Sequence, residues 1–166
     1  RAQAAASSVI QTAEEFGRAI GELLQIPVMG RIVAGQPVPL PPSDFNYFDA
    51  ESWVDVASSQ LPRRHSTPEN LFALEVEGDS MIDAMVNDGD IVVMEKAQEA
   101  RNGEMVAVWL TDKDETTLKY FYRENGHVRL QPANPHMEAI IIDDPSTVQV
   151  QGKVVMVIRQ VQGMAA

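Results

Sequence analysis

The sequence predicts an all-β fold of eight or nine short strands. Three observations lead to this class: short apolar runs with strand-like alternation recur at close spacing, prolines and glycines separate them, and Asn125-Gly126 marks a tight turn between two of them. Runs that follow one another this closely favour an all-β domain over a βαβ fold. A length of 166 residues suits one domain with a substantial core.

Residues 1–26 differ from the remainder of the chain. Apolar and small residues recur there at three- and four-residue steps, a weak amphipathic helix pattern. Its members are Ile10, Ala13, Gly17, Ile20 and Leu24. Because glycine disfavours a helix interior, we interpret residues 1–26 as a linker or the remnant of a missing neighbouring domain. The chain begins at Arg1 and not at methionine, so we expect a fragment or a processed product.

The strand-like runs begin with residues 28–33, which end at Ala34-Gly35. Four prolines follow closely, and since proline interrupts a sheet interior, we expect residues 36–52 to form a long extended connection. The later runs alternate apolar and polar residues or are rich in β-branched and aromatic ones. They cover residues 53–57, 71–77, 91–94, 105–110, 116–122, 128–131, 139–142 and 148–158.

Two of these runs are separated by Asn125-Gly126, and both residues tolerate the positive φ of a type I′ turn. We therefore expect a β-hairpin at this point. The whole series predicts a folded domain over residues 27–160, followed by a tail over 161–166.

Composition excludes several classes of function. The formal net charge of −11 argues against these residues binding DNA or an anionic membrane by themselves, because phosphate contact needs clustered Lys and Arg. The absence of cysteine excludes disulfides, zinc–thiolate sites and thiol nucleophiles. No apolar run approaches the roughly 20 residues of a membrane span. The three histidines show no metal-ligand spacing, so we expect neither a metal nor a cofactor.

Ser80 directly follows a predicted strand and has a glycine, Gly78, two positions before it. Glycine permits a sharp turn that leaves neighbouring backbone N–H groups pointing outward, as a nucleophile with an oxyanion hole requires. A serine at this point equally suits the N-cap of a short helical turn from Met81 to Met85. Taken alone, the local sequence favours the helix cap.

Lys119 lies in the run 116–122, whose β-branched and aromatic content is typical of a buried strand. Alternation places it on the face that also carries Thr117 and Phe121. One interpretation is a half-exposed lysine whose aliphatic stem covers apolar surface. The other is a desolvated, neutral amine that acts as a general base. An environment that lowers its pKa from about 10.4 to about 7 costs roughly 4–5 kcal/mol.

Several segments together resemble the catalytic half of LexA-type self-cleaving repressors. In chain order they are 78–83 (GDSMID), 87–93 (NDGDIVV), 102–107 (NGEMVA), 117–119 (TLK) and 152–159 (GKVVMVIR). Upstream, residues 27–37 (PVMGRIVAGQP) resemble that family's self-cleavage segment. The combination of an Ala-Gly site, a Gly-x-Ser-Met serine and a downstream lysine is highly specific. The resemblance implies a compact LexA-like β domain with a flexible cleavage loop.

The resemblance also implies a Ser-Lys peptidase that acts on its own chain. Ser80 is then the nucleophile, and deprotonated Lys119 takes its proton. Thr117 is expected to orient the lysine, and the backbone N–H groups of Asp79 and Ser80 to bind the oxyanion. We expect the side chain of Asp79 to point to solvent, since an inward carboxylate would raise the pKa of the lysine.

The cleaved bond, by the same resemblance, joins Ala34 and Gly35. Small residues on both sides let such a loop enter a narrow site, and Ile32 and Val33 are expected to anchor it in apolar pockets. Because the loop is tethered to the catalytic domain, its effective concentration at the nucleophile is high.

The partners implied by the resemblance are a second copy of the chain, in a homodimer, and the RecA filament on single-stranded DNA, which stimulates cleavage and so ends repression of DNA-damage (SOS) genes. Operator DNA is expected to be bound only through an N-terminal domain absent from this chain, in the cytoplasm. Four alternatives stay open: a UmuD-like polymerase accessory protein, a phage CI-like repressor, a dimerisation module with an idle dyad, and a peptidase that processes other chains.

Overall fold

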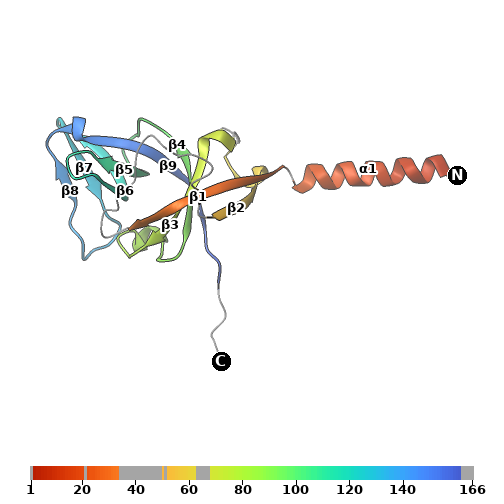
Figure 1. Cartoon of the computed structure of the whole chain (residues 1–166), viewed down its shortest axis with the longest axis horizontal. Coiled ribbons are helices and arrows are strands. Elements are labelled where there is room, and N and C mark those ends of the chain that lie inside the picture. The colour runs from red at the N-terminus through yellow and green to blue at the C-terminus, as the bar shows by residue number, and fades with distance from the viewer. Residues whose placement is uncertain (1, 21, 34–49, 51, 63–67, 162–166) are drawn as a thin grey trace, which may run out of the picture.

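The computed structural model describes residues 2–20, 22–33, 50, 52–62 and 68–161 (Figure 1). Apart from short 3₁₀ turns, the regular structure of these residues consists of one helix and nine strands. They are α1 Ala2–Ile20, β1 Leu23–Val33, β2 Ser52–Ala57, β3 Leu71–Glu77, β4 Ile91–Lys96, β5 Glu104–Leu110, β6 Glu115–Glu124, β7 His127–Gln131, β8 Ile140–Ile142 and β9 Val148–Ile158. The predicted all-β class is confirmed, with α1 outside the sheet.

The nine strands of the described residues form one sheet in the order β2-β1-β3-β4-β9-β5-β6-β7-β8. Strand β9 connects its two halves, because its first residues pair with β5 and its last residues with β4. Both pairings contain a register shift, as expected where a strand bends. Strands β1 and β6 are in contact although four other strands lie between them in the sheet order. The sheet therefore curls, and its two halves face each other around a core.

The central core cluster includes direct chain neighbours of Ser80 and Lys119. It includes the buried side chains of Phe72 and Leu74 on β3, Leu118 on β6, and Met81 in the turn after β3. Met81 and Leu118 are both 0% exposed, and each is the chain neighbour of a predicted catalytic residue. Because buried side chains in close packing hold one position, the core fixes the backbone at Ser80 and at Lys119.

The N-terminal segment differs in part from the prediction. Residues 2–20 form α1, which extends away from the sheet in Figure 1, in agreement with the amphipathic pattern. No helix within the described residues is long and apolar enough to cross a membrane. The assignment of residues 1–26 to a linker or domain remnant stays a prediction, as do the domain limits 27–160 and 161–166.

Strand β1 begins at Leu23 and not at the predicted Val28. Leu24, which was counted with the helix pattern, is buried in this strand together with Ile26 and Val28. The error has a physical reason. This stretch is extended because it pairs with β2, from Leu23 opposite Ala57 to Val28 opposite Ser52, and such a distant partner leaves no local signal.

The other predicted strands are confirmed, with small differences at their ends. The hairpin is also confirmed: Asn125 and Gly126 have φ of 49° and 81°, and they join β6 to β7 with Glu124 opposite His127. Both central residues are left-handed, as a type I′ turn requires. The extended connection predicted over 36–52 lies mostly outside the described residues.

Gly152→Ala is expected to lower the free energy of unfolding by about 2 kcal/mol, because overpacking a filled site costs this order. A Cβ at this position would lie 2.9 Å from Cζ of Phe72 and 3.0 Å from the backbone oxygen of Glu95. Phe72 is 1% exposed and packs in the central core cluster, so its ring can move away only by displacing other core side chains. Urea denaturation of the variant beside the parent chain measures the change. An unaltered urea midpoint would show that strands β4 and β9 move apart enough to accept the methyl group without loss of stability.

Candidate active site

Ser80 lies in a tight turn that begins where β3 ends at Glu77. Gly78 has φ of 99°, which a residue with a side chain adopts only under strain. Its backbone N–H donates to Oδ1 of Asp88 at 2.9 Å, which ties the turn to the segment before β4. The turn brings Ser80 to a fully buried position, with an exposed fraction of 0%.

The helix-cap interpretation of Ser80 is wrong. The short 3₁₀ helix that follows covers Ile82–Ala84, its N-cap residue is Met81, and no side chain caps it. The Ser80 hydroxyl instead lies 3.1 Å from Nζ of Lys119.

Lys119 projects from β6 into the same buried space, and with 4% of its surface exposed it is not the half-exposed lysine of the alternative interpretation. Its Nζ lies 2.8 Å from Oγ1 of Thr117 and 3.0 Å from the carbonyl oxygen of Leu118. Burial, which penalises the charged form, lowers the pKa of Lys119 from 10.5 to about 8. A measurable fraction of the amine is therefore neutral near pH 7.

The Thr117 contact agrees with the orienting position predicted from the sequence. The contact with the carbonyl of Leu118 was not anticipated, because a backbone oxygen carries no residue-specific signal. Together these two oxygens hold the amine at the end of a long, otherwise flexible side chain, so that its nitrogen stays next to Ser80.

The backbone N–H groups of Asp79 and Ser80 have no hydrogen-bond acceptor within the part of the chain that the structure describes. The carbonyl of Asp79 does have partners: Nδ2 of Asn134 donates to it at 3.0 Å, and the N–H of Ile82 at 3.2 Å. The side chain of Asp79 is exposed, as expected from the sequence. Within the described residues, these two N–H groups are therefore left for an acceptor from elsewhere.

Asn134 is a site neighbour that sequence reasoning missed. It lies in the loop after β7, is 8% exposed, and is preceded by Ala133, whose carbonyl accepts the N–H of Asp83 at 2.8 Å. This loop therefore contacts the Ser80 turn twice. A lone asparagine between two prolines reads as an ordinary loop residue, so no local pattern could have identified it.

The strand that leads to the predicted cleavage site runs beside the strand that leads to Ser80. Strands β1 and β3 are parallel, with Ile32 opposite Val76 and Val33 opposite Glu77. Ile32 is 1% exposed and packs in the central cluster, while Val33 is partly buried. Ala34 and Gly35 themselves lie outside the described residues.

An ion pair between buried Asp90 and exposed Arg159 braces the segment that follows the Ser80 turn. Asp90 is 1% exposed, and Arg159, at the end of β9, donates to both of its oxygens at 2.8 and 2.7 Å. The hydrogen bonds from Arg159 hold the pKa of Asp90 below its usual value. Arg159 also donates to the carbonyl of Met85 at 3.0 Å. No local pattern in the sequence indicates this pair, because its two residues lie 69 positions apart.

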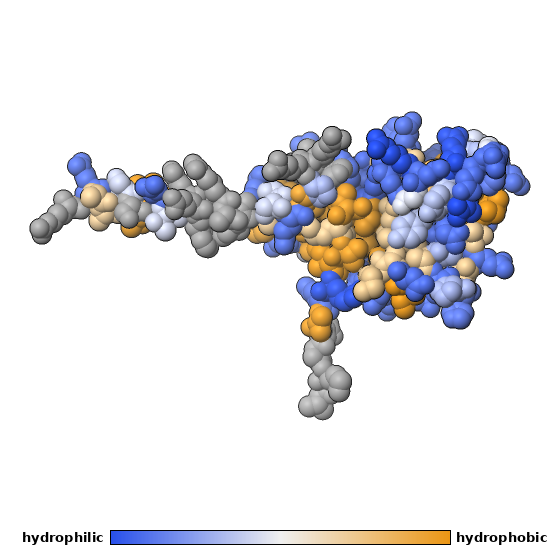
Figure 2. Space-filling view, turned by 180° about the vertical axis from the view of Figure 1, so that it is seen from behind, coloured by the Kyte–Doolittle hydropathy of each residue, from blue (hydrophilic) through white to orange (hydrophobic). Residues whose placement is uncertain are grey.

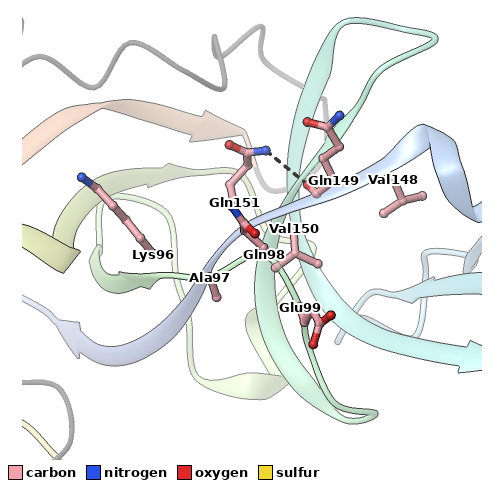
Figure 3. A pocket seen from close by; sticks show the side chains of 8 residues that line it. All are labelled: Lys96, Ala97, Gln98, Glu99, Val148, Gln149, Val150 and Gln151. Carbon is pink, nitrogen blue, oxygen red and sulfur yellow. Dashed lines mark hydrogen bonds between the residues drawn. The ribbon is translucent and has the colours of Figure 1, made fainter.

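A separate hollow of about 970 Å³ lies where the β4–β5 connection meets the start of β9 (Figure 3). It is lined by Lys96, Ala97, Gln98, Glu99, Val148, Gln149, Val150 and Gln151. None of the predicted site residues is among them. Among the described residues there is also no cluster of His, Asp and Glu that could hold a metal ion.

Comparison with known proteins shows the family of the chain. The family model described as Peptidase S24-like matches residues 27–155. The LexA repressor of Roseiflexus sp. (strain RS-1) is 46% identical over 138 residues, which cover 81% of this chain and 60% of the relative. The LexA repressor of Bacillus subtilis (strain 168) is 40% identical over 149 residues, 89% of this chain and 65% of the relative. The LexA repressor of Bacillus licheniformis is 38% identical over 157 residues, which cover 94% of this chain and 69% of the relative. The chain thus spans about 60% of the first relative.

Proposed function

This chain belongs to the Peptidase S24-like family, as a domain of LexA type, and on that premise we propose that it is the self-cleaving part of a LexA-like repressor. The observation that carries the proposal is the contact of 3.1 Å between Nζ of Lys119 and Oγ of Ser80 in a buried site. A lysine with a pKa of about 8 beside a serine hydroxyl is the arrangement of a general base and its nucleophile.

The proposed reaction starts with neutral Lys119. Its Nζ accepts the hydroxyl proton of Ser80 while Oγ attacks the carbonyl carbon of Ala34. The carbonyl oxygen becomes an oxyanion and is bound by the N–H groups of Asp79 and Ser80. The C–N bond to Gly35 then breaks, and the leaving nitrogen takes the proton from Lys119. Water hydrolyses the ester between Ser80 and Ala34, which releases the carboxylate of Ala34 and restores the serine.

One feature of the described residues supports Ala34-Gly35 as the bond that is cleaved. Val33 lies opposite Glu77, and β1 and β3 run in the same direction, so β1 ends beside the point where β3 turns toward Ser80. In this proposal Ile32, packed in the core, and Val33 anchor the loop.

The proposed repressor acts in the cytoplasm and binds operator DNA through a separate N-terminal domain. An acidic domain with a charge of −11 fits this division of roles, because it does not compete for phosphates. We expect the RecA filament on single-stranded DNA to favour the conformer in which the cleavage loop meets Ser80, which would end repression of DNA-damage genes. A catalytically idle module is less well supported, since it has no use for a buried lysine beside a buried serine.

We propose an exposed apolar surface as the contact of the homodimer. Apolar surface gathers on one face of the domain near the point where the C-terminal segment leaves it (Figure 2). Met85 is 73% exposed and Val161, just past β9, is 89% exposed. The contact between Arg159 and the carbonyl of Met85 places these two regions side by side. Exposed apolar groups at one place favour a protein partner.

Cleavage is expected to accelerate with pH and then level off above the pKa of Lys119. For a pKa of about 8, the neutral fraction of the amine rises about 90-fold between pH 6 and pH 9. The purified chain should be incubated across this range, and its products followed by mass spectrometry. The fragments should correspond to a cut between Ala34 and Gly35.

The matched control for this experiment is Ser80→Ala, which should remain intact at every pH. An intact parent chain at pH 9 to 10, or cleavage of the Ser80→Ala chain at the same bond, would contradict the proposed function.

A further inference from the structure

The peptide bond between Asp79 and Ser80 has its carbonyl held on one side, while its N–H on the other side has no acceptor among the described residues. Nδ2 of Asn134 donates to the carbonyl oxygen at 3.0 Å, and the N–H of Ile82 lies at 3.2 Å from the same oxygen. The N–H of Ser80 belongs to the same planar unit. In a trans peptide, the C=O and N–H bonds point in opposite directions, and no cis peptide is present in the described chain. A partner that fixes the carbonyl therefore also fixes the direction of the N–H.

The amide of Asn134 can adopt only one orientation in this position. Its Oδ1 accepts the backbone N–H of His136 at 2.9 Å, which requires an acceptor at that end. Its NH₂ group must then face the carbonyl of Asp79, where a donor is needed. With 8% of its surface exposed, the side chain is also shielded from competing water. Asn134 is thus a rigid, correctly oriented donor.

A second contact keeps the whole loop in place. The carbonyl of Ala133 accepts the N–H of Asp83 at 2.8 Å, so the backbone beside Asn134 is attached to the Ser80 turn independently of the amide. Removal of the Asn134 side chain is therefore expected to leave the loop docked. What it removes is one of the two hydrogen bonds that orient the peptide plane.

We propose that Asn134 is a positioning residue that aims the N–H of Ser80 at the oxyanion formed during self-cleavage. This inference rests on the proposed function. Asn134 acts through the peptide of Asp79 and Ser80 and does not touch the reacting atoms itself. Preorganised donors stabilise an oxyanion far better than donors that must reorient during the reaction. Loss of the contact should therefore slow the chemical step and leave the proton affinity of Lys119 unchanged.

The test compares the self-cleavage rates of the parent chain, Asn134→Ala and Asn134→Leu from pH 6 to pH 10. Alanine removes the donor, and leucine removes it while keeping the volume. In both variants the rate on the alkaline plateau should fall by about 10- to 100-fold, less than or similar to the loss of a complete oxyanion donor. The pH at half-maximal rate should stay near 8, the pKa of Lys119. Melting temperatures are recorded so that every rate is measured on folded protein.

Asn102→Ala is the matched control. Asn102 also connects a loop to a backbone group, since its Oδ1 accepts the N–H of Arg123 at 2.8 Å. Arg123 lies near the C-terminal end of β6, four residues after Lys119, so this contact is not part of the Ser80 turn. This variant should cleave at the parent rate. Plateau rates of both Asn134 variants within threefold of the parent, or a displaced half-maximal pH, would overturn the positioning role. A parent chain that does not cleave would instead overturn the proposed function itself.

Discussion

Lys119→Met is expected to stop self-cleavage and, at the same time, to raise the free energy of unfolding at pH 7. Without the amine, no group accepts the proton of Ser80, so cleavage should fall by at least a thousandfold, a loss typical of removing a member of a catalytic unit. Methionine has a similar length and is apolar. It therefore removes the free-energy cost of burying a charged amine, a cost that the fall of the lysine pKa from 10.5 to about 8 reflects.

The size and sign of the stability change follow from linkage. This fall in pKa corresponds to a free energy of unfolding that is lower by about 3 kcal/mol at every pH at which the folded chain carries the charged lysine. That penalty is complete below pH 8, and it disappears as the pH rises from 8 to 10.5, because the unfolded chain then loses the proton as well. The variant should be more stable than its parent at pH 7, by up to about 3 kcal/mol, and nearly equal to it above pH 10.5.

Urea denaturation at the two pH values measures this difference. Both chains should carry Ser80→Ala, which keeps them intact during the experiment. A Lys119→Met chain that is less stable than its parent at pH 7 would contradict the view that the lysine is held in place at a cost to stability.

Arg159→Leu is expected to lower the free energy of unfolding. Removing the guanidinium leaves the carboxylate of Asp90, the buried partner of the pair, without its counter-charge. Asp90 is 1% exposed, and Arg159 donates to both of its oxygens. The change also removes the hydrogen bond to the carbonyl of Met85.

Asp90→Asn in the same chain is the matched rescue. It removes the uncompensated charge and retains an acceptor for the N–H of Asn87, which lies 2.7 Å from Oδ2 of Asp90. The double variant should recover part of the stability that the single variant loses. In the parent chain, the lowered pKa of Asp90 means that the pair stabilises the fold above the ordinary pKa of 3.8, and this contribution is lost as the pH falls through the lower folded value.

Urea denaturation of the single and double variants at neutral pH tests whether the uncompensated charge of Asp90 causes the loss of stability. Equal stability of Arg159→Leu and the parent chain would show that water reaches Asp90 when the guanidinium is removed. A double variant no better than the single one would assign the loss to packing of the Arg159 side chain and not to charge.

The prediction of strands succeeded where the signal is local. The hairpin at Asn125-Gly126 follows from the tolerance of two residues for positive φ, and the core strands follow from their β-branched content. The beginning of β1 was missed, because Leu24 and its neighbours are extended only through pairing with β2. The apparent helical spacing of Leu24 with upstream residues continued past the end of α1 at Ile20 and into β1, which begins at Leu23.

The sequence by itself determined the family and the order of the strands along the chain, and it predicted Ser80 and Lys119 as candidate catalytic residues, since these depend on residue types and their order. Only the tertiary structure decided where these two side chains lie and what surrounds them. They stand 39 positions apart, and only the curl of the sheet brings their side chains within 3.1 Å. Burial then lowers the pKa of the lysine, and Asn134, from a third loop, reaches the peptide before the serine. Proximity, desolvation and orientation arise from contacts between distant segments, which no local pattern records.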